Sequence, residues 1–92
     1  MRVHSTATLN AANSFCNNVE ISGWFNVSIR GTFNGTISLQ RCLSGQNTFA
    51  DVATYNNAIE TYVFEPEGHA IYRLGFAANN YNSGNATVRL SR

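Results

Sequence analysis

The sequence predicts an all-β protein, a two-layer antiparallel β-sandwich of about seven to eight strands with an Ig-like or jelly-roll-like Greek-key order. Two observations predict it. Apolar residues nowhere recur at helical spacing for more than a turn. Instead, β-branched and aromatic residues form short alternating runs separated by Gly, Asn and Ser. Runs that repeat every 8–12 residues or so are typical of sandwiches and small barrels.

The expected strands span residues 5–9, 14–20, 24–30, 36–42, 49–54, 59–64, 70–77 and 86–91. Three of them alternate clearly, so that one face lies in a core and the other faces water. Their inward residues are Phe25, Val27, Ile29, Ile37, Leu39, Ala86, Val88 and Leu90. The first strand has two alternatives, since residues 1–13 form either an N-terminal arm that contacts a neighbour or the first strand of the domain, and residues 14–92 form the sandwich domain.

Between the third and fourth strands, Asn34-Gly35 resembles a two-residue hairpin turn. A strict turn there would pair Ile29 with Gln40 and place opposite polarities on one face. A longer loop beginning at Gly31, or a bulge at one glycine, restores the apolar residues of both strands to the same side. We therefore expect a hairpin with the longer loop.

The composition narrows the function. The chain has 92 residues, which suits one domain, and its charged fraction of 12% is half the usual share of about 25%. A net charge of +1 argues against nucleic-acid binding.

No targeting or membrane-spanning segment is visible, so we expect no membrane partner and synthesis in the cytoplasm. Cys16 and Cys42 form no CxxC motif and are expected to be free, buried thiols unless their strands lie side by side.

The densest polar cluster is FEPEGHAIYRLGF, residues 64–76, which contains Glu65, Glu67 and His69. These side chains suit either a metal or acid–base site, or the exposed side of a tight corner between strands. We expect the corner, because two glutamates beside a Pro/Gly turn are normally too exposed for a raised pKa. The sequence therefore predicts no catalytic residue, no metal and no cofactor, and a protein that is not an enzyme.

The residues Phe64, Pro66, Gly68 and Tyr72 resemble the E–F corner of immunoglobulin-like and fibronectin-type sandwiches. The resemblance implies that an apolar residue ends one strand, a Pro/Gly turn follows, and the tyrosine hydroxyl bonds back to the corner backbone. The inward residues of this segment would be Phe64, Tyr72, Leu74 and Phe76.

Six residues are candidates for contact with a partner: Arg2, Val3, His4, Trp24, Tyr55 and Tyr81. The first three belong to the N-terminal segment. Trp24 either packs into the sandwich or faces a partner, since Trp is rarely buried completely and is enriched at binding hot spots. The tyrosines lie in Asn-rich surroundings that suit glycan stacking or packing against another protein.

Short sequence segments at residues 31–41, 48–53, 72–75 and 88–91 resemble segments of small β-sandwich virion proteins of tailed bacteriophages, of the capsid decoration or cement type. The resemblance runs from about Ile21 to Arg92. It implies a non-enzymatic structural protein on the capsid surface, often a homotrimer, that binds the major capsid protein lattice and stabilises the shell. The alternative is a carbohydrate- or receptor-binding module of a phage tail or fibre, with Trp24, Tyr55 and Tyr81 gathered on one face.

Overall fold

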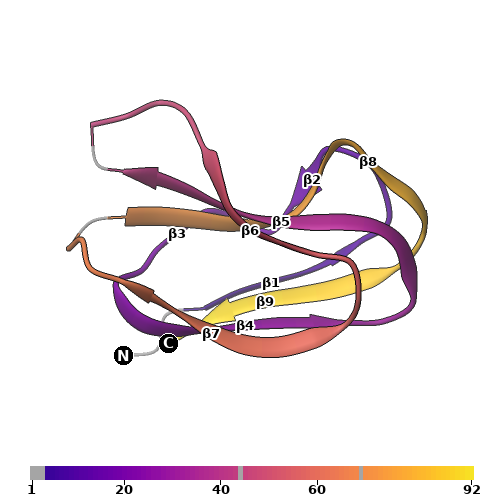
Figure 1. Ribbon diagram of the computed structural model, residues 1–92, viewed down its shortest axis with the longest axis horizontal. Helices are drawn as coiled ribbons and strands as arrows, with labels where there is room; N and C mark the ends of the chain where they lie inside the picture. Colours follow the sequence, from indigo (N-terminus) through magenta and orange to yellow (C-terminus); the bar gives the residue numbers. More distant parts are fainter. Residues whose placement is uncertain (1–3, 44, 69) are drawn as a thin grey trace.

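The computed structural model describes residues 4–43, 45–68 and 70–92, and the predicted two-layer antiparallel β-sandwich is confirmed (Figure 1). Sheet A has the strand order β1 (His4–Leu9), β9 (Ala86–Ser91), β4 (Gly23–Arg30) and β7 (Ile59–Glu65). Sheet B has the order β2 (Ser14–Phe15), β8 (Ala70–Gly84), β5 (Phe33–Leu43) and β6 (Ala50–Tyr55), and β3 (Val19–Glu20) also pairs with β8. The described residues contain no helix that is long and apolar enough to span a membrane.

The core fills the space between the two sheets, and alternation along each strand decides which side chains enter it. The inward residues predicted for β4, β5 and β9 are all buried. Together with them, the buried core contains Leu9, Cys16, Ile21, Ala70, Tyr72, Leu74 and Phe76. Cys16 and Cys42 are buried and free, as expected.

Three sequence expectations about the strands differ from the structure. The segment 14–20 is two short strands, β2 and β3, which both pair with β8. Strand β8 extends through Gly84, beyond the expected end at Ala77. The predicted hairpin between the third and fourth expected strands is wrong, because these strands are β4 and β5 and belong to different sheets. Their apolar residues meet in the core from opposite sides, and Asn34-Gly35 lies within β5, where its pairing with β8 shifts register.

The segment from His4 to Leu9 forms the first strand of the protein's own sheet, since it pairs antiparallel with β9 from His4↔Ser91 to Leu9↔Ala86. Of the contact candidates in this segment, Arg2 and Val3 lie outside the described residues, and His4 is exposed on β1.

Gly75 lies in β8 at the point where β2 pairs with it, opposite Phe15. Strands β2 and β8 approach so closely that a Cβ at Gly75 would lie 2.2 Å from the Ser14 carbonyl oxygen and 2.6 Å from the Phe15 Cα. Glycine is therefore required here by backbone approach.

Candidate binding face

The outer face of sheet A brings polar and aromatic side chains from four strands into rows. Because neighbouring strands are paired in fixed register, outward residues of β1, β9, β4 and β7 stand side by side. One row contains Thr6, Arg89, Ser28 and Glu60. The next row contains His4, Ser91, Asn26 and Tyr62, and beyond it Trp24 lies opposite Phe64.

Three exposed aromatic rings at one end of this face form what we call the ring cluster: Trp24, Tyr62 and Phe64. The Trp24 ring packs against Tyr62 with centroids 5.5 Å apart and against Phe64 with centroids 5.1 Å apart. Their residues remain 61%, 67% and 50% exposed, respectively. Large contiguous apolar groups on a surface mark contact sites, since exposing them to water is unfavourable.

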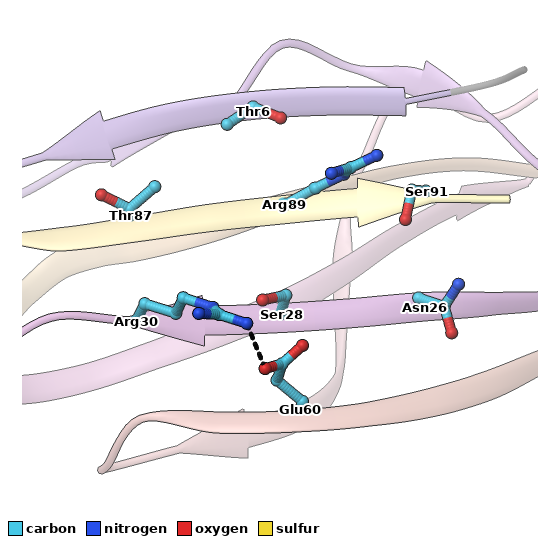
Figure 2. Close-up of a pocket in the computed structure, with 8 residues that line it drawn as sticks. All are labelled: Thr6, Asn26, Ser28, Arg30, Glu60, Thr87, Arg89 and Ser91. Atoms are coloured by element: carbon cyan, nitrogen blue, oxygen red, sulfur yellow. Dashed lines mark hydrogen bonds and ion pairs between the residues drawn. The ribbon is translucent and has the colours of Figure 1, made fainter.

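A shallow groove of about 480 Å³ lies beside the ring cluster and runs across β1, β9, β4 and β7 (Figure 2). It is lined by Thr6, Asn26, Ser28, Arg30, Glu60, Thr87, Arg89 and Ser91. A smaller hollow of about 190 Å³ shares three of these residues and continues to Tyr62. The lining thus consists of hydroxyls, an amide, two guanidinium groups and one carboxylate.

The two arginines of the groove differ in their partners. Arg30 donates from Nη2 to Glu60 Oε2 at 2.5 Å, an exposed ion pair that neutralises its charge locally (Figure 2). Arg89 lies on β9 with its side chain extended toward Ser91 (Figure 2). Its Nε is buried and has no hydrogen-bond partner among the described residues. A buried donor in this state costs about 1–3 kcal/mol.

The opposite face of the sandwich provides a comparison. On sheet B, Arg73 stacks between the rings of Phe15 and Phe49, each centroid 4.1 Å from the guanidinium carbon. Its Nε donates to Gln40 at 2.8 Å, and Gln40 in turn donates to Asp51 at 2.9 Å. The protein therefore satisfies the outward arginine of sheet B internally, whereas Arg89 lines the groove of sheet A and its Nε has no partner among the described residues.

At the polar corner of residues 64–76, Pro66, Glu67 and Gly68 are exposed as the sequence predicts, but Glu65 is not. Glu65 is 1% exposed and lies at the end of β7 on the inward side, where it follows Ile59, Thr61 and Val63 in alternation. Phe64 points outward instead, so its expected inward position is wrong. The exposed ring finds its contact in Trp24 rather than in the core.

A buried network holds the Glu65 carboxylate. Arg41 of β5 binds it through two hydrogen bonds, from Nε to Oε1 and from Nη2 to Oε2. The Tyr72 hydroxyl donates to Oε1 at 2.7 Å, and the Glu67 backbone N–H donates to Oε2 at 2.7 Å. Since Glu65 belongs to sheet A and Arg41 and Tyr72 to sheet B, the network joins the two sheets across one end of the sandwich.

The network changes the ionisation of its members. Burial raises the pKa of Glu65, but the hydrogen bonds from Arg41, Tyr72 and the Glu67 backbone outweigh this effect and lower the pKa to about 2. The hydrogen bond to Glu65 raises the pKa of Arg41. Burial, followed by the hydrogen bond to Glu65, raises the pKa of Tyr72. Glu65 is therefore held as a carboxylate.

The corner resemblance needs one correction. Tyr72 is buried as expected, but its hydroxyl bonds to the Glu65 side chain and not to the corner backbone. Pro66 and Gly68 are exposed in the turn between β7 and β8. His69 lies outside the described residues, and within the remainder no group of three His, Cys, Asp or Glu side chains is arranged to hold a metal ion.

Replacing Tyr72 with phenylalanine tests the network. The Phe25 ring packs 4.7 Å from the Tyr72 ring and keeps this contact in the variant, so the loss is confined to one hydroxyl donor. We expect urea unfolding to show a free energy of unfolding lower by about 1–2 kcal/mol. Tyr62→Phe is the matched control, because Tyr62 is exposed, and an equal loss in both variants would contradict the role of the buried hydroxyl.

Comparison with protein families, curated proteins and solved structures finds no match to this chain. The site therefore stands on the geometry of its own residues.

The structure separates the aromatic candidates that the sequence grouped. Trp24 is exposed and does not pack into the sandwich, while its contact with a partner stays a prediction. Tyr55 lies on β6 of sheet B, half-buried against the core. Tyr81 packs on Phe76 with centroids 5.0 Å apart, and its hydroxyl donates to the Gly84 carbonyl at 2.9 Å. Neither tyrosine shares a face with Trp24.

The sequence analysis missed Tyr62, Phe64 and Arg89 as members of a shared surface. Alternation carried the signal: if Phe25 is inward, Trp24 is outward, and the same parity places Arg89 outward between Val88 and Leu90. The strand order β1-β9-β4-β7, which brings these residues together, has no signature in the sequence.

Proposed function

We propose that this protein is a non-enzymatic structural protein of a bacteriophage virion that binds the major capsid protein lattice through the ring cluster and thereby stabilises the shell. The observation that carries the proposal is that Trp24, Tyr62 and Phe64 form one exposed patch. In protein interfaces a few residues supply most of the binding energy, and Trp and Tyr are enriched among them. The partner, the major capsid protein, is proposed from the resemblance of short sequence segments of this protein to decoration proteins.

The position of the ring cluster supports docking to a protein. Tyr62 and Phe64 belong to β7, an edge strand of sheet A, so a partner can contact the rings and the outer backbone edge of β7 together. Many such modest interfaces, repeated over a lattice, would stabilise a shell by mass action. A homotrimer on the capsid surface is part of the same proposal.

Substituting Trp24 with alanine tests the docking surface. In co-sedimentation with capsids assembled without this protein, we expect the variant to bind at least about 30-fold more weakly, because a central Trp contributes on the order of 2 kcal/mol. Val52→Ala is the control, since Val52 is 48% exposed on β6 of the other sheet. Equal binding by wild type and Trp24→Ala would reject the ring cluster as the docking surface.

The mass of the purified protein in solution tests the trimer separately. Sedimentation equilibrium is expected to give three times the chain mass of 10.1 kDa. A monomer mass at the protein concentrations used for capsid binding would reject the trimer and leave the docking proposal to the co-sedimentation result.

We propose a second candidate, a carbohydrate-binding module of a tail or fibre, because of the groove beside the rings. Its lining of hydroxyl, amide and guanidinium groups matches the hydrogen-bonding groups of a sugar, and its volume of about 480 Å³ is in the range of small-ligand sites. Asn26 of the groove lies directly opposite Tyr62 of the ring cluster, so the two surfaces adjoin.

A further inference from the structure

We propose that the groove of sheet A binds a carboxylate-bearing sugar, of the sialic or uronic acid class, and that Arg89 receives the carboxylate. This inference rests on the carbohydrate-binding function proposed above and names the class of ligand for that groove.

The state of Arg89 is the first argument. Among the described residues, its Nε is buried without a hydrogen-bond partner. Arg89 belongs neither to the ion pair of Arg30 with Glu60 nor to that of Arg41 with Glu65. A guanidinium presents paired N–H donors in a plane, and a carboxylate accepts two of them at once. Because Arg89 lines the groove, a bound carboxylate could accept from two N–H groups of its guanidinium at once, which a single hydroxyl could not do.

The surroundings of Arg89 are the second argument. Its direct neighbours on the adjacent strands are Thr6 on β1 and Ser28 on β4, and Ser91 lies two residues along β9. Hydroxyl groups both donate and accept hydrogen bonds, which suits the hydroxyl-rich ring that carries a sugar carboxylate. None of the eight lining residues is a large apolar residue, so an apolar ligand would leave these groups without partners.

The charges of the groove are the third argument. Arg30 and Arg89 face one acidic lining residue, Glu60, and Glu60 is already paired with Arg30 at 2.5 Å. The uncompensated positive charge in the groove is thus that of Arg89. An anionic ligand complements this charge, and a neutral sugar leaves it unused.

The test compares sialyllactose with lactose, which differ by the acidic sugar alone, in titrations followed by nuclear magnetic resonance of the isotope-labelled protein. A triuronic acid provides a second acidic probe, and a hexaglutamate peptide offers carboxylates without sugar. We expect both acidic sugars to bind at least about tenfold more tightly than lactose and the peptide. Resonances of the β1, β9 and β4 residues of the groove are expected to shift.

Two variants separate binding from structure. Arg89→Gln is expected to lower the affinity for sialyllactose at least about tenfold without lowering the melting temperature, because it removes a donor that the fold leaves unpaired. Ser28→Asp places a carboxylate directly across from Arg89 and is expected to block the acidic sugars while raising the melting temperature. If Arg89→Gln unfolded the protein, Ser28→Asp would still decide the question.

The outcomes distinguish the two levels of the proposal. If lactose and sialyllactose bound equally, and Arg89→Gln had no effect, Arg89 would not select a carboxylate, while the carbohydrate-binding function would stand. If neither sugar bound at millimolar concentrations, the function itself would fall. Tighter binding of hexaglutamate than of the acidic sugars would overturn the inference in favour of an acidic protein partner.

Discussion

Replacing Glu65 with glutamine is expected to lower the free energy of unfolding by about 3 kcal/mol at pH 7, a large part of the 5–15 kcal/mol or so typical of a domain. The carboxylate accepts hydrogen bonds from Arg41, Tyr72 and the Glu67 backbone in a buried position. Glutamine keeps the shape, but its amide NH2 faces donors and cannot neutralise Arg41. Arg41 is only partly exposed, and in the variant its charge has no counterion. This unpaired charge accounts for the lower free energy of unfolding.

The same variant is expected to change the acid dependence of stability. The pKa of Glu65 falls from an ordinary 4.5 to about 2 on folding, so between these values the unfolded chain binds more protons than the folded one. The contribution of the Glu65 carboxylate to the free energy of unfolding is fully present above about pH 4.5 and is lost as the pH falls to about 2. The difference between wild type and Glu65→Gln should therefore shrink over this interval.

Urea unfolding at a series of pH values measures both effects. Glu67→Gln is the matched control, because Glu67 is an exposed acid of the same corner and its substitution is expected to change the free energy by less than about 0.5 kcal/mol. If Glu65→Gln and Glu67→Gln behaved alike, or if the loss persisted unchanged at pH 2, the buried network would not stabilise the fold through charge.

Gly75→Ala is expected to destabilise the protein by about 3 kcal/mol or more. The new Cβ would lie 2.2 Å from the Ser14 carbonyl oxygen and 2.6 Å from the Phe15 Cα, so backbone must move. Displacing β2 would break its pairing with β8 and pull Phe15 away from Arg73, which stacks on it. A lower melting temperature and faster hydrogen exchange in residues 14–16 are the expected results.

Gly68→Ala is the control for that substitution. Gly68 lies in the turn after β7, and a Cβ there would meet no atom within 4 Å. The variant should unfold within about 0.5 kcal/mol of wild type. A Gly75→Ala protein as stable as Gly68→Ala would show that β2 can withdraw from β8 without cost.

Alternation predicted most of the fold because a single face of each strand enters the core. The inward residues of β4, β5 and β9 followed directly from their spacing in the sequence. The pairing of β4 with β5 did not follow, because an Asn-Gly pair indicates a hairpin locally, whereas the choice between pairing and crossing to the other sheet depends on contacts far along the chain.

The candidate site was less accessible to sequence reasoning, for two physical reasons. Hydrophobicity alone assigned Phe64 to the core and Glu65 to solvent, yet parity along β7 reverses both positions, and a distant arginine, Arg41, makes the burial of Glu65 favourable. The groove requires β9 to lie between β1 and β4, a neighbourhood that local spacing does not encode.

The central position of β9 also has a consequence for the order of folding. Strands β1 and β4 are both hydrogen-bonded to β9 and not to each other. Until residues 86–91 leave the ribosome, β1 therefore lacks its partner strand, whereas β4 can already pair with β7, and β5 with β6. A nascent chain stalled before residue 86 would leave β1 unpaired and the β9-facing edge of β4 open. This state is the most exposed to aggregation, so chaperone binding should be strongest there.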